Sequence, residues 1–469
     1  MATDCTPRQL ELQGFGRRTL VAAFDGGQIT SDGGLPLLHL VERRRRIIGR
    51  FAECFADHRD PRLIEHRVEE LVGQRVYALA SGYEDLNDHD ELRRDPLLAS
   101  VAGKADPTGG DRRQAQDRGK PLAGKSTLHR LEWGLQGEAA DDRYRRIAVD
   151  PEAVDRFFVD LFVDGHDQPP EEITLDLDAT DDPLHGAQEG RFFHGYYNSY
   201  CYLPLYIFCG SHLLCARLRR SNIDASEGSV EELERIVGQI RQRWPEVRIR
   251  VRGDSGFARE ALMRWCEQHG VDYIFGLARN ARLEDALEPA FERVEELCAD
   301  SEQPERVYDE FAYRTLDSWS RERRVIGKAE ITLWGPNPRF VVTSLAGDPA
   351  TLYERVYCAR GDMENRIKEQ QLCLFADRTS AHLMRVNQVR LWLSSVAYLL
   401  LDELRRLGLA GCELARAQCD TIRLKLLKIG ARVRISVRRV VVSLASAHPS
   451  RAVFIHAWER LARAGPTTS

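Results

Sequence analysis

The 469-residue chain has few features that point to export, to a membrane or to a cluster of sulfur ligands. Its longest apolar run, "LWLSSVAYLLL" at 391–401, is well short of the ~20 residues that span a bilayer, and its opening residues contain no apolar signal segment. The 11 cysteines form no CxxC pair and no zinc-type spacing, which favours reduced thiols over a disulfide framework. These absences predict a cytoplasmic protein with no membrane partner.

A strand is missing where a nucleotide-binding loop would need one. The stretch "GKPLAGKS" at 119–126 satisfies the phosphate-loop pattern G-x-x-x-x-G-K-[ST]. Such a loop joins a buried strand to a helix, but residues 106–120 contain no apolar run, and Pro121 removes one N–H donor. We therefore expect no bound nucleotide, and interpret "STLHRLEWGL" as a helix that Ser126 or Thr127 caps.

The net charge of −5 gives no overall excess of positive charge, yet the charge is unevenly distributed. Between Thr421 and Ser469 there are ten Lys or Arg residues and one Glu, and Arg43 to Arg46 form a second basic cluster. Basic ends around an acidic middle suit a protein that holds a polyanion while its centre holds cations. On charge alone, a solvated helix face explains these residues equally well.

The length predicts two to four domains of about 150 residues each, and no internal repeat is visible. Residues 1–150 are expected to be mainly helical, and the pattern of 151–282 is three strands, a helix, a strand, a helix and a strand. This is the order of an RNase H-like α/β core with a mixed sheet. An antiparallel β insertion is expected at 283–345, a helical second part of the core at 346–408, and a basic C-terminal region at 409–469. The expected core strands are 173–179, 202–210, 212–220, 247–255 and 271–278, and the expected core helices are 229–244 and 258–266.

Carboxylates lie at the ends of two of these strands. Asp176 and Asp178 share one face of the first strand, because side chains alternate with period two. Asp254 follows the apolar run 247–251 and precedes a glycine-containing turn. The first and fourth strands are neighbours in an RNase H-like sheet, so Asp178 and Asp254 are expected to meet as a metal site. A strand-end aspartate taken singly is more often a cap or turn residue.

A third carboxylate is expected on a helix that Asp348 caps, with Pro349 at its first position. At 100° per residue, one polar stripe roughly 80° wide lies beside an apolar stripe that packs on the sheet. An amphipathic helix with ordinary surface charge has the same pattern. The polar stripe contains Tyr357, Arg360, Glu364, Lys368 and Gln371, and the apolar stripe contains Leu352, Val356, Met363, Ile367 and Leu374.

The segments "DLDATDDP", "VRGDSGF" and "YCARGDMENRIKE" together resemble the three catalytic segments of DDE transposases from bacterial insertion sequences. One branch of these enzymes has the signature Y-x2-R-x3-E-x6-K, which Tyr357, Arg360 and Glu364 match in spacing. Gln371 stands where the signature has lysine, and Lys368, one turn earlier, is a candidate for that role. The segments "ITSDGGLPLL", "DPLHGAQEG" and "RFVVTSL" further resemble insertion-sequence family 1380, so the resemblance extends from near residue 15 to about 445.

The resemblance implies a Mg2+-dependent DNA transposase, with Mn2+ as a possible substitute. Asp178, Asp254 and Glu364 would be the catalytic residues and would hold two metal ions, with Asp176 as the competing first ligand. Water would release the 3′-hydroxyl at each element end, and that hydroxyl would attack target DNA without any nucleotide cofactor. Arg360 and Lys368 would clamp phosphates beside the metals, and Tyr357 would position the element end or the adjacent strand, so these three residues are expected to bind DNA at the site.

By the same resemblance, the partners are double-stranded DNA, at the terminal inverted repeats and the target, and a second copy of the chain in a homodimer on DNA. Residues 1–150 and the basic tail, with Arg432, Arg434, Arg438 and Arg439, are the expected DNA-binding regions of a nucleoid-associated bacterial protein. Three alternatives remain open. They are an RNase H-like nuclease or resolvase that only hydrolyses, an inactive DNA-binding descendant, and an ATP-driven enzyme that needs Lys125.

Overall fold

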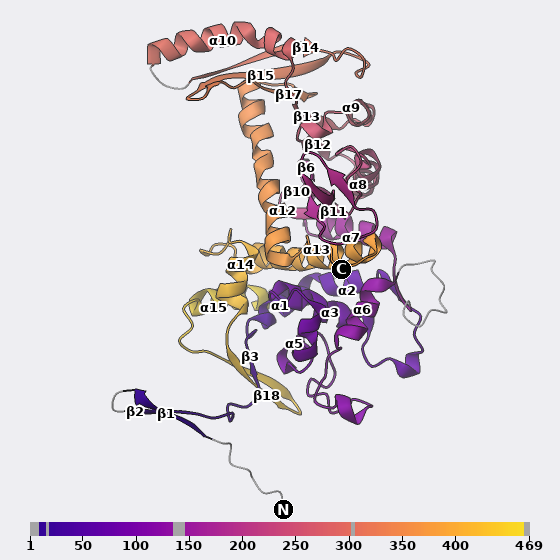
Figure 1. The fold of residues 1–469 in the computed structure, drawn as a ribbon, viewed down its shortest axis with the longest axis vertical. Coiled ribbons are helices and arrows are strands. Elements are labelled where there is room, and N and C mark those ends of the chain that lie inside the picture. The colour runs from indigo at the N-terminus through magenta and orange to yellow at the C-terminus, as the bar shows by residue number, and fades with distance from the viewer. Residues whose placement is uncertain (1–8, 16–17, 135–145, 302–304, 464–469) are drawn as a thin grey trace, which may run out of the picture. The chain divides into compact units, whose positions relative to one another are not determined.

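The computed structural model describes residues 9–15, 18–134, 146–301 and 305–463, drawn as a ribbon in Figure 1. The chain divides into two compact units. A terminal unit consists of residues 1–149 together with 396–469, and a central unit consists of residues 150–395. Helix α13 (Met384–Glu403) begins in the central unit and ends in the terminal one. None of the helices within the described ranges has the length and apolar character that a bilayer crossing requires.

The terminal unit combines helices with short strands that the sequence pattern did not predict. Strand β18 pairs with β3 in the register Ala431 to Thr30, so segments from both ends of the chain share one sheet. Its helices are α1 (Leu35–Arg45), α2 (Ile47–Ala52), α3 (Val68–Ala80), α4 (His89–Leu92), α5 (Pro96–Val101), α6 (Lys125–Trp133), α14 (Cys419–Ile422) and α15 (Arg451–Arg463). Its strands are β1 (Leu10–Phe15), β2 (Arg18–Ala22), β3 (Ile29–Thr30), β4 (Phe55–Asp57), β5 (Ile147–Val149), β18 (Ala431–Ser436) and β19 (Arg439–Leu444).

The glycines of the "SDGG" motif allow this junction between the chain's ends. A Cβ atom on Gly34 would lie 1.8 Å from the carbonyl oxygen of Leu426, so no larger residue fits there. The N–H of Gly34 donates to the carbonyl of Leu427 at 3.1 Å. Lys428 forms an ion pair of 2.7 Å with the buried Asp32. The motif therefore joins the start of α1 to the segment that precedes β18.

The central unit is a mixed α/β fold around a large mixed sheet in the order β11-β10-β6-β12-β13-β17-β15-β14. Strand β12 runs parallel to both β6 and β13, whereas β10 and β11 are antiparallel to their neighbours. The first and fourth strands of the predicted core, β6 and β12, are adjacent, which is consistent with an RNase H-like core. The strands are β6 (Glu172–Ala179), β7 (Asp182–Pro183), β8 (Phe192–His194), β9 (Ser199–Tyr202), β10 (Leu205–Cys209), β11 (His212–Arg217), β12 (Arg248–Gly253), β13 (Asp272–Leu277), β14 (Arg306–Tyr313), β15 (Arg323–Thr332), β16 (Gly335–Pro336) and β17 (Arg339–Thr343). The helices are α7 (Pro151–Val163), α8 (Ser229–Arg243), α9 (Glu260–Gln268), α10 (Ala281–Ser301), α11 (Pro349–Thr351) and α12 (Gly361–Leu374).

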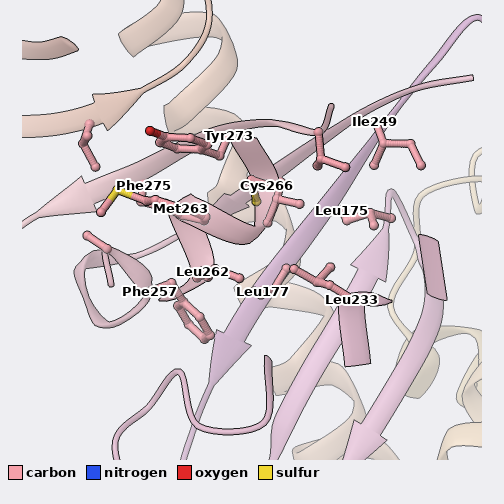
Figure 2. Packing of buried hydrophobic residues seen from close by; sticks show 14 of the residues in the cluster. Leu175, Leu177, Leu233, Ile249, Phe257, Leu262, Met263, Cys266, Tyr273 and Phe275 are labelled. Carbon is pink, nitrogen blue, oxygen red and sulfur yellow. The ribbon is translucent and has the colours of Figure 1, made fainter. Parts of the chain in front are cut away.

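One face of the sheet is apolar because the strands alternate with period two. Leu175 and Leu177 on β6 and Ile249 on β12 are buried in one cluster with residues of α8 and α9. Figure 2 shows these side chains in the same packed layer as Leu262 and Phe275. Burial of each such side chain contributes about 1.5–3 kcal/mol. This layer fixes the register of β6 against β12, and with it the position of the polar residues between the leucines.

The opposite face of the same strands carries charge. Asp176 and Asp178 alternate with the buried leucines of β6 and lie on this face. Further along the sheet, Ile274 forms a small apolar cluster with Leu352 and Tyr353. The segment that begins near residue 349 therefore packs across the charged face, as its apolar stripe predicts.

The region 283–345 differs from the predicted β insertion at its start. Residues 281–301 form helix α10, whose buried residues Leu283, Leu287, Ala290 and Val294 recur at helical spacing. Strands β14, β15 and β17 follow and are antiparallel, and they continue the main sheet beyond β13. Figure 1 shows α10 alongside β14 and β15.

The region 346–408 is helical but is not one regular helix. Asp348 caps its start by accepting from the N–H of Thr351, and Pro349 takes the first position, as predicted. Residues 352–357 form a π-helical turn, 358–360 form a 3-10 turn, and the α-helix α12 begins only at Gly361. The expectation of a uniform α-helical stripe from Tyr357 to Gln371 is corrected accordingly.

Helix α6 (Lys125–Trp133) starts two or three residues earlier than a cap at Ser126 or Thr127 would place it. Its N-cap residue is Gly124, and neither Ser126 nor Thr127 caps it. Instead, a side chain from another segment caps the first turn, because Asp90 accepts a hydrogen bond from the backbone N–H of Lys125. No strand leads directly into this helix, because residues 118–124 are irregular and follow a short 3-10 turn.

Candidate active site

Two of the predicted carboxylates meet where β6 and β12 end. The parallel register pairs Asp176 with Arg252 and Leu177 with Gly253, so the next step along both strands brings Asp178 beside Asp254. Asp254 caps the following turn by accepting from the N–H of Gly256 at 2.8 Å. It therefore has the turn role common for a strand-end aspartate and also lies next to Asp178.

The third carboxylate approaches from the helix. Burial raises the pKa of Asp178 to about 7, with Arg360 lowering it and the negative charges of Asp254 and Glu364 raising it further. Asp178 lies beside Asp254 in the strand register, and Arg360 contacts Glu364 and lies near Asp178, so the three predicted carboxylates lie in one region of the central unit.

Arg360 supplies the positive charge at this site. Its guanidinium donates to Glu364 at 2.6 Å and lies 3.8 Å from the carboxylate of Asp178. Within the described ranges, no three or more His, Cys, Asp or Glu side chains are grouped closely enough to hold a metal ion. In this arrangement an arginine, and not a preformed carboxylate cage, balances the charge of the acidic residues.

Tyr357 packs against β13, where a glycine makes room for its hydroxyl group. A Cβ atom on Gly276 of β13 would lie 2.5 Å from the hydroxyl oxygen of Tyr357. Burial raises the pKa of Tyr357. The positive charge of Arg360 lowers this pKa, and the negative charge of Asp254 raises it. Tyr357 therefore lies near Asp254, and Arg360 lies against Glu364.

A pocket of about 370 Å³ opens from this point. Asp254 and Tyr357 line it together with Arg279, after β13, and Arg339, at the start of β17. Both arginines are exposed. Sequence reasoning missed them, although each follows or begins an expected strand, which is where functional side chains commonly lie.

Asp176, the competing first ligand, has a different environment from Asp178. It is 4% exposed, and Arg252 binds both of its oxygens. Arg252 also donates to the carbonyl of Val356, in the π-helical turn. Sequence reasoning missed Arg252, because its role depends on the register between β6 and β12.

The two candidates for the position of the signature lysine, Lys368 and Gln371, have different environments on α12. Lys368 is exposed. Gln371 donates to the Oδ1 atom of Asp182 at 2.9 Å and to the carbonyl of Asp181 at 3.1 Å. Asp182 is fully buried, and burial raises its pKa to about 8. Gln371 therefore hydrogen-bonds a buried acid, and as a neutral side chain it cannot supply the positive charge of the signature lysine.

The predicted basic residues of the tail lie on one hairpin of the terminal unit. Arg432 and Arg434 are on β18, Arg439 begins β19, and Arg438 is in the turn between them. All four are exposed. The cross-strand register places Arg434 opposite Val441 and Arg432 opposite Ser443, so positive charge extends along one face of the hairpin.

Three other cations that the sequence singled out form ion pairs within the terminal unit. In the cluster at 43–46, Arg45 pairs with Glu403 at 3.3 Å and Arg46 pairs with Glu53 at 2.8 Å. The ammonium group of Lys125 lies 3.0 Å from Asp90. Arg45, Arg46 and Lys125 therefore each have an acidic partner within this unit.

A family model described as transposase DDE domain group 1 matches residues 12–466. No curated protein matches the chain. Among solved structures, the chain is similar to the piggyBac transposase in a cryo-EM structure of its synaptic complex with hairpin DNA. The two share 11% sequence identity with a TM-score of 0.40, over 85% of this chain and 79% of that chain.

Proposed function

The chain belongs to the transposase DDE domain group 1 family, and we propose that it is the DNA transposase of a bacterial insertion sequence. It would cut at the element's terminal inverted repeats and join the freed 3′-hydroxyls to target DNA. The observation that carries this proposal is the position of Arg360, which contacts Glu364 and lies near Asp178, at the point where β6 ends beside Asp254.

The three side chains are of the type that Mg2+ prefers, since it favours carboxylate and water ligands, but they would have to draw closer than they stand here to hold two ions. Asp178, Asp254 and Glu364 would hold the ions. The raised pKa of Asp178 reflects burial and two further acidic groups, and added positive charge would relieve that repulsion. When bound, two ions activate the attacking oxygen and stabilise the leaving one. Glu364 must release the guanidinium of Arg360 to act as a ligand, so Arg360 becomes available for a DNA phosphate.

The cations around the site suit a DNA strand. Arg279 and Arg339 line the pocket that Asp254 and Tyr357 share, and a phosphate in that pocket would meet positive charge on two sides. Tyr357 would position the strand beside the carboxylates. Lys368, exposed on α12, is the remaining cation of the predicted signature on that helix.

The terminal unit is proposed to hold double-stranded DNA. Its four hairpin arginines, Arg432, Arg434, Arg438 and Arg439, are exposed, whereas Arg45 and Arg46 are held by glutamates. Residues 1–150 and 409–469 would thus serve together as the DNA-binding regions. Because two element ends are cut in concert, the active species is proposed to be a homodimer assembled on DNA, without a nucleotide.

The decisive experiment is cleavage and joining of an element-end duplex by Asp178→Asn, Asp254→Asn and Glu364→Gln. Each variant should lose both Mg2+-dependent steps and keep DNA binding, because each loses a ligand and no phosphate-binding cation. Asp362→Asn, an exposed carboxylate on the same helix as Glu364, is the matched control and should stay active. Cleavage by all three triad variants would refute the proposal.

The same assay separates the alternatives. A nuclease or resolvase would hydrolyse the end but would not join it to a second DNA, whereas a DNA-binding descendant would bind and do neither. For the hairpin, neutralising Arg432, Arg434, Arg438 and Arg439 should lower the slope of log affinity against log salt by roughly 0.9 per lost phosphate contact. The change should be equal for element-end and random DNA, and smaller for Arg46→Ala, since Arg46 is already paired.

A further inference from the structure

A β-hairpin of the central unit exposes a concentration of aromatic rings. In this aromatic hairpin (residues 192–202), β8 pairs with β9 through a turn in which Asn198 has a left-handed backbone with φ of 50°. Four of the seven exposed large aromatic side chains of the described residues lie in it, so the exposure is local and not a general property of the surface. Their exposed fractions are 37% for Phe192, 54% for Phe193, 86% for Tyr196 and 45% for Tyr200.

The aromatic hairpin adjoins the carboxylates. The hydroxyl of Tyr197 donates to the carbonyl of Ala179, the residue after Asp178, at 3.3 Å. Burial raises the pKa of Tyr197, as do the charges of Asp181 and Asp178. The rings of Tyr196 and Tyr197 meet edge to face with centroids 5.0 Å apart. A short series of rings therefore leads from the most exposed tyrosine to the candidate active site.

Positive charge accompanies the rings. The guanidinium carbon of Arg191 lies 4.2 Å from the ring centroid of Tyr200, which meets Phe193 edge to face at 5.6 Å. Arg220 is exposed, and its backbone forms an isolated antiparallel β-bridge with Tyr202 at the base of the hairpin. Rings with adjacent guanidinium groups match a ligand that combines flat aromatic groups with negative charge.

We propose that the aromatic hairpin binds unpaired nucleotides of the DNA strand that is cut at Asp178 and Asp254. The proposal rests on the proposed function in that it assumes a DNA strand at these carboxylates. Bases inside a duplex are already stacked on their neighbours, so exposed rings gain most from bases that have left the helix. Base stacking on aromatic side chains is worth about 1–3 kcal/mol per base and tolerates any sequence. Phe193 and Tyr196 are the side chains expected to stack, with Arg191 and Arg220 beside the phosphates.

The test compares single-stranded and duplex DNA without catalysis. Fluorescence anisotropy would measure binding of a labelled 16-nucleotide oligo-dT and of a 16-base-pair duplex, with Ca2+ in place of Mg2+. The double variant Phe193→Ala with Tyr196→Ala should bind the single strand about 10- to 100-fold more weakly, at roughly 1.4 kcal/mol per tenfold. Its duplex affinity should change less than about twofold, because phosphate contacts dominate there.

The matched controls keep a ring or remove one elsewhere. Phe193→Tyr with Tyr196→Phe should bind like the unmodified protein, and so should Trp334→Ala, which removes a ring that is 97% exposed on another turn of the central unit. Equal losses on both DNAs, an unchanged single-strand affinity, or a loss that follows Trp334 instead would each overturn the proposal. A change of oligomeric state without a change in single-strand affinity would instead make the hairpin a contact between copies, and would overturn it too.

The two proposals fail separately. If the triad variants still cleave while the ring variants lose single-strand binding, the proposed function is wrong and the aromatic hairpin remains a nucleotide-binding surface. If the triad variants are inactive and the ring variants bind normally, only the role of the hairpin is wrong. Folding of each ring variant can be checked by its melting temperature, which should change little because Tyr196 and Phe193 are exposed.

Discussion

Arg252 of β12 binds both carboxylate oxygens of Asp176 on the neighbouring strand β6. Its remaining terminal nitrogen donates to the carbonyl of Val356, in the turn that precedes Arg360. The pair thereby connects two parallel strands to the segment that carries Tyr357 and Arg360. Asp176 and Asp178 share one face of β6, but their environments differ. Asp176 is paired with Arg252, whereas the negative charges of Asp254 and Glu364 raise the pKa of Asp178.

We predict that Asp176→Asn lowers the free energy of unfolding and that Asp178→Asn does not. Removing one partner of a buried ion pair costs about 3–5 kcal/mol, so Asp176→Asn should lower the free energy of unfolding by this order. Asp178→Asn should not lower it, because the substitution removes a charge that burial and Asp254 disfavour. Urea unfolding measures both. At a temperature where it is folded, Asp176→Asn should retain metal-dependent cleavage; an inactive but fully stable Asp176→Asn would make Asp176 the first ligand.

Much of the core could be predicted from the sequence because local periodicity determines it. The alternation around Leu175 and Leu177 predicted β6 to within one residue, and the spacing of Leu233, Ile236 and Ile240 predicted α8. The adjacency of the first and fourth strands was predictable from the RNase H-like order of the elements, because few topologies connect them. The meeting of carboxylates at two strand ends then followed from the adjacency of β6 and β12.

Features that depend on contacts between distant segments could not be predicted in this way. The pairing of Arg252 with Asp176 requires the strand register, and the approach of Tyr357 to Gly276 requires the path of a π-helical turn. Helix α10 was missed for another reason. Its buried stripe of Leu283, Leu287 and Val294 is a helical signal, but Pro289 within it and the strands that follow favoured a β interpretation.

Removal of Arg360 should strengthen metal binding while it impairs the reaction. Its guanidinium contacts Glu364 and lies near Asp178, so Arg360→Ala leaves three carboxylates without a balancing charge. Calorimetry without DNA should show Mg2+ or Mn2+ bound roughly 10-fold more tightly, or about 1.4 kcal/mol. Arg366→Ala on the same helix, where Arg366 pairs with Asp362, is the control. An unchanged affinity in Arg360→Ala would show that this arginine does not compete with the metal.

Gly276→Ala should act through Tyr357. The added Cβ atom would lie 2.5 Å from the tyrosine hydroxyl and 3.0 Å from the backbone nitrogen of Ser255, so the ring must move. Displacement of a positioning group by about 1 Å can cost up to roughly 100-fold in rate, and we expect a loss of 10- to 100-fold in cleavage. Gly238→Ala on α8, where nothing lies within 4 Å of the added atom, is the control. If Gly276→Ala lowers cleavage equally with and without Tyr357→Phe, the two residues act independently.

Lys125→Ala should leave cleavage intact and independent of ATP. No strand precedes the loop, and the ammonium group of Lys125 is held by Asp90 and by Asn87 at 3.1 Å. Because this pair is half-exposed, the change should lower the free energy of unfolding by less than about 1 kcal/mol. Cleavage with and without ATP, together with urea unfolding, measures both effects. ATP-stimulated cleavage that disappears in a folded Lys125→Ala would restore the nucleotide-binding interpretation.

Asp182 should make the stability of the protein decrease as the pH rises. Its side chain is fully buried, Gln371 donates to one oxygen, and the other has no hydrogen-bond partner among the described residues. Burial raises its pKa in the folded state from 3.8 to about 8, so between these values the folded protein holds a proton that the unfolded chain has released. The free energy of unfolding then decreases with rising pH by up to about 1.4 kcal/mol per pH unit, and this decrease ends above the folded pKa.

Asp182→Asn removes this titration, so its free energy of unfolding relative to the unmodified protein should increase from pH 5 to pH 8. Asp285→Asn, at an exposed position of α10, should show no such trend. Urea unfolding at pH 5, 6.5 and 8 measures the difference, and a difference that is constant across this range would show that Asp182 is ionised in the folded protein.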